Sequence, residues 1–159
     1  MMNKTRVWVA GFGNEYREDD AAGVILAARL YEFLSGEPDV EATLCLEHQL
    51  LPELVDDLAG ADVALFCDAN TVLHEEGFSI REILPNSELE GFNMHSMGPE
   101  WLLALAGKVG MPPKKALLVT VSGDRFDFSE TPTAACAKRI GRAREAFEKY
   151  WRHNYGRAE

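Results

Sequence analysis

The stretch RVWVAGFGNEYREDDAAGV, residues 6–24, decides the fold of this chain. Its first five residues form an apolar run typical of a buried strand, and a loop with two glycines follows at residues 11–18. A second apolar pattern, with helical spacing, predicts a helix over residues 19–34. A strand that leads through a glycine-bearing loop into a helix indicates the start of an α/β sheet.

The same alternation continues along the rest of the chain. We predict strands at residues 40–46, 62–67, 78–84 and 116–121, and helices at 52–58, at 98–109 and from Thr131-Pro132 onward. The run at 78–84 follows the third strand without a helix between them, which favours an antiparallel strand. We therefore predict one domain over residues 1–159, a three-layer α/β/α sandwich of the phosphorylase/hydrolase-like type with a central, mostly parallel sheet of about five strands. The polar tail after Trp151 is expected to fray.

The composition narrows the function classes. Lys and Arg number 16 against 26 Asp and Glu, and the net charge of −10 argues against nucleic-acid partners and anionic membrane surfaces. No apolar run approaches the roughly 18 residues of a membrane-spanning helix, and the start lacks the features of a secretory signal. Three cysteines without CxxC spacing disfavour a disulfide framework or a zinc knuckle. We expect a cytoplasmic protein without membrane insertion.

The glycine loop is only partly that of a dinucleotide-binding protein. Gly11 and Gly13 match the first two glycines of the G-x-G-x-x-G fingerprint, but Tyr16 stands at the third position. We therefore expect no nucleotide cofactor. Two glycines at this spacing still allow a tight turn and a close approach of the backbone.

Acids and one histidine are the candidate chemical groups. Asp19 fits the cap of the first helix, and Asp20, one residue into that helix, is the acid expected to face the crevice at the sheet edge. Asp68 ends the most apolar strand, either as a functional group at the carboxyl edge or as the cap of a turn. Cys67 points to the opposite face and is predicted to be a core thiol. His95 lies in a glycine-bearing loop before a helix.

One constellation of residues resembles a known family. It consists of Gly11-Phe12-Gly13-Asn14, then Asp19-Asp20, then Gly23, followed by Asp68 at a strand end and His95 in a loop before a helix. This pattern resembles the hydrogenase maturation endopeptidases, the proteases that trim the large subunit of [NiFe] hydrogenases. The similarity covers residues 7–24, 62–70, 95–107 and 117–124.

The resemblance implies an activity and a set of site residues. The implied catalytic and metal-binding groups are Asp20, Asp68 and His95, and the implied substrate loop contains Gly11, Gly13 and Asn14. Two carboxylates and one imidazole suit a divalent metal and leave positions open to substrate and water. The metal would be nickel carried by the large-subunit precursor, from which the enzyme removes a C-terminal extension. Whether nickel only marks the substrate or also polarises the scissile carbonyl is left open by these residues.

Three departures from the family pattern stand out. Asp20 occupies a position where some members have Glu, so the ligand is about one methylene shorter. Ala21 stands where glycine is frequent. Residues 122–130, SGDRFDFSE, match the late family loop only loosely, and we expect them to bear on substrate specificity.

Three alternatives stay open on the sequence alone. Gly13-Asn14 followed by Tyr16 resembles the opening of peptidyl-tRNA hydrolases, but their histidine soon after the motif is absent and the net charge opposes a tRNA ligand. A non-catalytic nickel- or small-ligand-binding protein would keep the same metal ligands without cutting a precursor. A degenerate member retained for interaction alone would not need Asp20, Asp68 and His95 intact. For the endopeptidase we expect a monomer.

Overall fold

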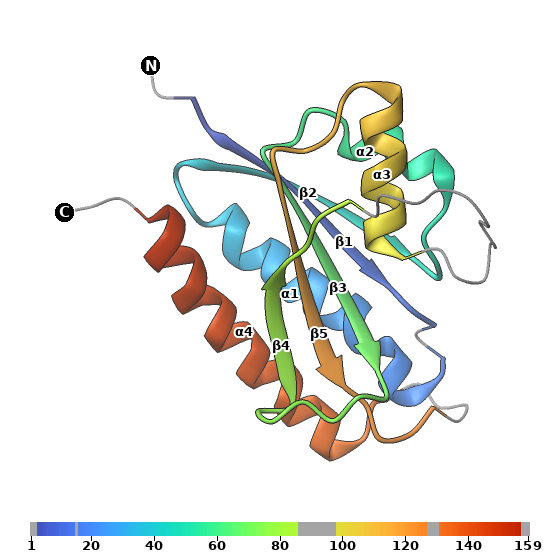
Figure 1. Cartoon of the computed structure of the whole chain (residues 1–159). Coiled ribbons are helices and arrows are strands. Elements are labelled where there is room, and N and C mark those ends of the chain that lie inside the picture. Colours follow the sequence, from blue (N-terminus) through green and yellow to red (C-terminus); the bar gives the residue numbers. More distant parts are fainter. Residues whose placement is uncertain (1–2, 15, 86–97, 127–130, 157–159) are drawn as a thin grey trace.

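A central sheet of five strands organises the computed structural model (Figure 1), which describes residues 3–14, 16–85, 98–126 and 131–156. The strands are β1 (Thr5–Phe12), β2 (Val40–Glu47), β3 (Val63–Asn70), β4 (Phe78–Glu82) and β5 (Lys115–Ser122), in the spatial order β2-β1-β3-β5-β4. All neighbours pair in parallel except β4, which runs antiparallel to β5. The predicted mostly parallel sheet and its antiparallel fourth strand are confirmed.

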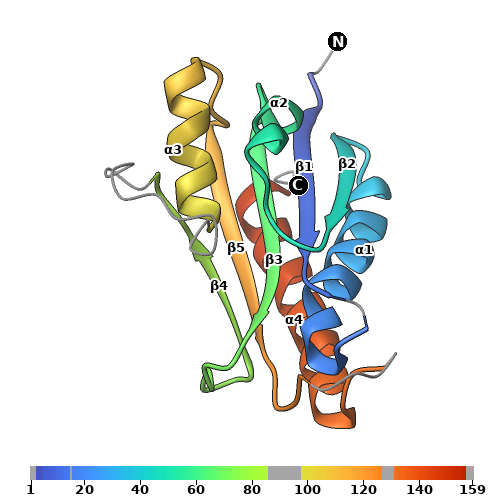
Figure 2. The same ribbon diagram turned by 90° about the vertical axis from the view of Figure 1, so that its right-hand side faces the viewer.

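Helices cover both faces of the sheet and complete the three layers (Figure 2). The long helices α1 (Ala22–Ser35) and α4 (Ala134–Tyr155) pack on one face, and the shorter α2 (Val55–Leu58) and α3 (Pro99–Val109) pack on the other. Two short 3₁₀ helices, η1 (Glu18–Ala21) and η2 (Pro52–Leu54), lead into α1 and α2. None of the helices in the described ranges is long and apolar enough to cross a membrane.

The larger core layer lies under α1 and α4. Leu26, Leu30 and Leu34 of α1 are fully buried, and Phe147 and Trp151 of α4 meet them from the neighbouring helix. These residues recur at intervals of three to four, so each helix presents one apolar stripe to the sheet. The helical periodicity read from the sequence is confirmed here.

The ends of the first and last helices differ from the prediction. The predicted first helix divides into η1 and α1, because the chain changes from 3₁₀ to α geometry after Ala21. The last helix begins at Ala134 rather than at Thr131-Pro132, because the Thr133 hydroxyl accepts a hydrogen bond from the Cys136 N–H and caps it. It continues to Tyr155, so the tail after Trp151 does not fray where we expected it to.

Two glycines let α1 lie unusually close to the strands. A Cβ built on Gly23 would lie 2.6 Å from the Phe12 carbonyl oxygen, 2.7 Å from that of Cys67 and 2.9 Å from the Cα of Asp68. A Cβ on Gly11 would lie 2.5 Å from the Cβ of Ala27. The first turn of α1 therefore rests directly on the backbone of β1 and β3, which fixes the segment before it relative to Asp68.

We predict that Gly23→Ala destabilises the fold by about 1–3 kcal/mol, because the new methyl group meets backbone atoms that cannot move aside. Gly141→Ala is the matched control: it also lies within a helix, but a Cβ there meets nothing within 4 Å. This control should be neutral or stabilising, by up to about 1 kcal/mol. Urea unfolding of both variants measures the difference, and equal midpoints would contradict the close packing at Gly23.

Candidate functional site

The carboxyl ends of β1, β3 and β5 meet at one edge of the sheet, where α/β folds collect their functional groups. Asp68 lies inside β3 opposite Thr120 of β5, two residues before the strand ends, because β3 is longer than the sequence predicted. Asp20 reaches the same edge from η1, the segment that follows β1. The structure thus brings these two predicted site residues to one place.

The loop after β1 holds the Asp20 carboxylate. The Asn14 N–H donates to Oδ2 of Asp20 over 2.8 Å, and Oδ1 of Asn14 in turn accepts from the Tyr16 N–H over 2.9 Å. Gly13 has a φ of 141°, and a Cβ at this position would clash with the Asp20 carbonyl oxygen. Gly13 and Asn14 therefore shape the loop around Asp20, and Gly11 serves the packing of α1.

Burial and a neighbouring charge raise the pKa of the Asp68 carboxyl group. Burial, opposed by a 2.8 Å hydrogen bond from the Ala69 N–H and reinforced by the charge of Asp20, raises the pKa of Asp68 to about 7. In the described part of the chain, the ion pairs involve neither Asp20 nor Asp68. The charge of Asp20 is one cause of the raised pKa of Asp68, so a divalent cation bound near both carboxylates would favour their charged forms.

Asp19 has a different role from the helix cap that the sequence predicted. Its side chain is fully buried, and the start of η1 has no side-chain cap. Its Oδ2 accepts from the backbone N–H of Asp124 (2.7 Å) and Arg125 (3.1 Å) and from the Thr133 hydroxyl (2.9 Å). Its Oδ1 accepts from the Thr133 N–H over 2.7 Å.

These contacts join three segments that are distant in the sequence. The Asp19 N–H also donates to the Arg125 carbonyl oxygen over 3.0 Å, so η1 and the loop after β5 are bonded in both directions. Burial raises the pKa of the Asp19 carboxyl, but the bonds from Asp124, Thr133 and Arg125 outweigh it and hold the pKa below its ordinary value. In the sequence, the only signal was an excess of acidic residues in this loop. It did not indicate which groups the Asp19 carboxylate would contact.

The thiol beside Asp68 is not a nucleophile. Cys67 is fully buried, and burial together with the charge of Asp68 raises its pKa far above the ordinary value. A thiol that stays protonated at neutral pH reacts poorly. The prediction of a core thiol is confirmed.

The third predicted ligand is not placed. His95 lies between residues 86 and 97, outside the described residues. Within the described ranges, no three side chains from His, Cys, Asp and Glu gather as a metal site. Residues 127–130 of the predicted specificity loop also lie outside the described residues. The metal-binding roles of Asp20 and Asp68, like that of His95, therefore stay predictions.

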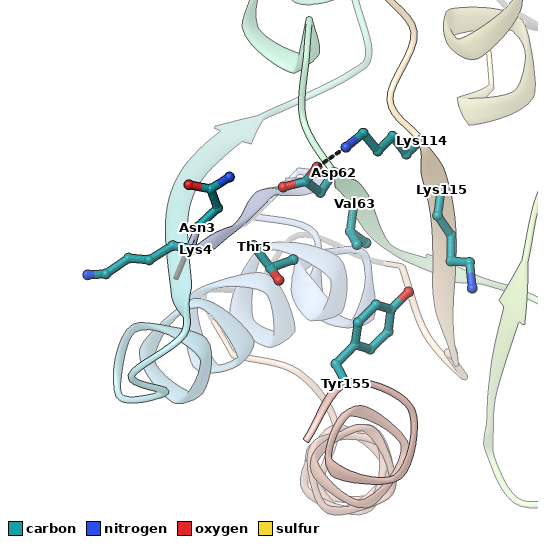
Figure 3. Close-up of a pocket in the computed structure, with 8 residues that line it drawn as sticks. All are labelled: Asn3, Lys4, Thr5, Asp62, Val63, Lys114, Lys115 and Tyr155. Atoms are coloured by element: carbon teal, nitrogen blue, oxygen red, sulfur yellow. Dashed lines mark ion pairs between the residues drawn. The ribbon is translucent and has the colours of Figure 1, made fainter. Parts of the chain in front are cut away.

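A separate pocket lies at the opposite, amino-terminal edge of the sheet (Figure 3). Its volume is about 400 Å³, and Lys114 closes one side by pairing with Asp62 at 3.1 Å. On another side, Nζ of Lys115 lies 5.7 Å from the ring centre of Tyr155. Because it adjoins the first residues of β1, β3 and β5, this pocket is a strand's length away from Asp20 and Asp68.

We predict that Asp19→Asn lowers the free energy of unfolding by about 3 kcal/mol at pH 7, because the buried amide cannot accept from all four donors of Asp124, Arg125 and Thr133. The pKa of Asp19 is lowered in the folded state, so its contribution is complete above pH 4 and is lost as the pH falls below that value. The difference in the free energy of unfolding between wild type and Asp19→Asn should therefore decrease as the pH falls below about 4.

Asp62→Asn is the matched control for this experiment. Asp62 also accepts from a backbone N–H, that of Arg6, and its pKa is also lowered, but it lies at the surface. We expect a loss below about 1 kcal/mol. Denaturant titrations between pH 3 and pH 7 measure both, and a constant gap for Asp19→Asn across this range would contradict the ionised, buried acceptor.

The fold of the chain matches solved structures over nearly its whole length. The [NiFe] hydrogenase maturation protease HycI from Thermococcus kodakarensis KOD1 superposes with a TM-score of 0.65 at 26% identity, and 92% of each chain is covered. The hydrogenase maturating endopeptidase HybD from E. coli gives a TM-score of 0.69 at 23% identity over 94% of each chain. The hydrogenase 2 maturation peptidase from Thaumarchaeota archaeon SCGC_AB-539-E09 gives 0.61 at 22% identity.

Comparison of the sequence itself gives no such match. No family model matches the chain, and no curated relative matches it either. The structural neighbours are named endopeptidases, proteases and peptidases of hydrogenase maturation, which agrees with the expectation of a hydrolase. The resemblance predicted from the glycine–asparagine–acid motif is therefore confirmed: over more than nine-tenths of its length, this chain has the fold of the hydrogenase maturation proteases.

Proposed function

We propose that this protein is an endopeptidase that removes a C-terminal extension from the nickel-loaded precursor of a [NiFe] hydrogenase large subunit. The observation that carries the proposal is the placement of Asp20 beside Asp68 at the carboxyl edge of the sheet, on a fold shared with a maturation protease at 26% identity. The precursor is then its protein partner. We expect a monomer that meets this partner in the cytoplasm.

The two carboxylates suit a cation that arrives with the substrate. Before it arrives, the pKa of about 7 leaves Asp68 partly protonated at neutral pH, and Asn14 holds the Asp20 carboxylate in place. A divalent ion between the two carboxyl groups would favour the charged form of Asp68 and release its proton. In this proposal His95 supplies the third ligand, since imidazole binds nickel well beside carboxylate oxygens.

The site is suited to recognising nickel in a precursor rather than keeping an ion of its own. Two short carboxylates at an open sheet edge leave most coordination positions to other ligands. Those positions would be filled by groups of the precursor, which places the adjoining peptide next to Asp20 and Asp68. The enzyme would then cut only precursors that carry the metal.

We predict that Asp68→Asn and Asp20→Asn each reduce processing of a nickel-loaded precursor by at least about 100-fold, because each removes a charged group from the site. Intact-mass measurement of the precursor after incubation detects loss of the C-terminal peptide. Glu145→Gln is the control, since Glu145 is an exposed acid on α4. Processing by Asp68→Asn at the wild-type rate would refute the proposed site.

The same variant separates function from folding. Since the pKa of Asp68 is raised to about 7, against about 4 in an unfolded chain, ionisation of this group costs stability as the pH rises through that window. Asp68→Asn removes this cost, so at pH 8 in metal-free buffer its melting temperature should equal or exceed that of wild type. A lower melting temperature would mean that the ionised carboxylate stabilises the fold.

His95→Ala should abolish the preference for nickel-loaded over nickel-free precursor, because the remaining ligands are two carboxylates. Pull-down of nickel-loaded and nickel-free precursor with His95→Ala protein, in which Asp68 is unchanged, measures this preference. His153→Ala, in the last turn of α4, serves as the control. If His95→Ala still retains nickel-loaded precursor as wild type does, His95 is not a ligand.

A further inference from the structure

One edge of the sheet is open to an added strand. β2 and β4 form the two edges (Figure 2), and among the described residues no strand pairs with the outer side of β2. β2 is eight residues long and contains neither proline nor lysine, two residues with which proteins commonly block exposed edges. An edge of this length without such protection is typical of a surface that another segment covers.

The register of β2 shows which peptide groups are free. The Thr5 N–H donates to the Asp39 carbonyl oxygen over 2.7 Å, and the Gly13 N–H donates to that of Glu47 over 3.1 Å. Along a parallel strand, residues whose peptide N–H and C=O groups bond to one neighbouring strand alternate with residues whose peptide groups point away from that strand. The N–H and C=O groups of Ala42, Leu44 and Leu46 therefore face outward along the edge.

A series of hollows follows the same strand. One hollow near its start contains Arg6, Glu41 and Asp57, and the middle one, about 460 Å³ in volume, adjoins it through shared Trp8, Thr43 and Asp57. The last hollow shares Leu46 and Glu47 with the middle one and contains Gly13, Val24 and His48. The first two hollows include Asp57 of α2, and the last includes Val24 of α1, so they flank β2 from the two faces of the sheet. The three hollows with the outer edge of β2 between them are here called the β2 groove.

The β2 groove leads to the candidate site. Its last hollow includes Gly13, whose neighbour Asn14 donates to Asp20. The Glu47 carbonyl at the end of β2 accepts from Gly13, so the strand and the Asp20 loop are bonded together. A peptide lying along β2 would therefore reach Asp20 without crossing another element.

The groove has a mixed apolar and acidic lining. Leu46 is 42% exposed, a large fraction for a leucine, and it borders two of the hollows. Glu41, Glu47 and Asp57 lie along the groove, against Arg6 at one end. Burial raises the pKa of the Cys45 thiol most, and the charges of Glu47 and Asp57 raise it further. Such a lining favours a segment with cationic side chains.

We propose that the β2 groove binds an extended, basic segment of the precursor that adds to the sheet beside β2 and leads its scissile bond to the site. This rests on the proposed function and goes beyond it by naming where the substrate chain lies. Backbone hydrogen bonds to Ala42, Leu44 and Leu46 would supply affinity, and the acids of the groove would select the charge of the segment.

The first test removes groove charges. The double variant Glu41→Gln, Asp57→Asn should raise KM for the nickel-loaded precursor about tenfold and leave kcat unchanged, since neither residue lies near Asp20 or Asp68. The matched control is Glu53→Gln, Asp56→Asn, which removes the same two charges from exposed positions of η2 and α2 outside the groove. Equal KM values for the two double variants would overturn the proposal.

The second test observes the edge itself. Amide hydrogen exchange is measured on the wild-type protein with and without a nickel-loaded precursor that carries proline at the residue after the scissile bond and is therefore not cut. Exchange at Ala42, Leu44 and Leu46 should slow at least about tenfold when the precursor is added, and exchange at β4 should not. Unchanged exchange at β2 in the presence of bound precursor would overturn the proposal.

Failure of the proposed function is distinguishable from failure of the docking. Cleavage by wild type with no protection of β2 would keep the function and refute the groove. Protection of β2 that the charge variant abolishes, without cleavage by wild type, would keep the groove and refute the function. If the wild type does not cleave the precursor and β2 is not protected, both proposals are refuted.

Discussion

The buried carboxylate of Asp19 is the interaction on which the arrangement of the site depends. It accepts four hydrogen bonds from Asp124, Arg125 and Thr133, and so connects the segment after β1 to the loop after β5 and to the start of α4. Thr133 is itself the cap of α4. A charged group excluded from water stays ionised only when its oxygens are satisfied in this way. The chain therefore has little freedom around Asp20, the next residue.

Close packing gives Asp20 its counterpart on the neighbouring strand. Gly11 and Gly23 allow the first turn of α1 to touch the backbone of β1 and β3, and this contact brings η1 over the position of Asp68. Burial raises the pKa of Asp68 most, and the charge of the nearby Asp20 raises it further. In the proposed function, a divalent cation would relieve the repulsion between the two carboxylates.

The site and the β2 groove share one structural cause. In a parallel sheet all strands end at the same edge, so an edge strand points toward the same place as the central strands. Among the described residues no strand pairs with the outer side of β2, and α2, on one face beside it, is only four residues long. The acids of β2 are exposed, and Ala42 and Leu44, which pack toward α1, are half-buried.

The sequence by itself determined the layers, the parallel sheet with its antiparallel fourth strand, the apolar stripes of the helices, the core position of Cys67 and the resemblance to the maturation proteases. It also singled out Asp20 and Asp68. These features follow from periodicity and from motifs within a few residues of each other. Tertiary structure alone decided that Asp19 is a buried acceptor rather than a cap and that three hollows flank β2. Each of these depends on segments more than a hundred residues apart or on the register between strands. Local sequence patterns do not indicate which distant hydrogen-bond donor a carboxylate will contact.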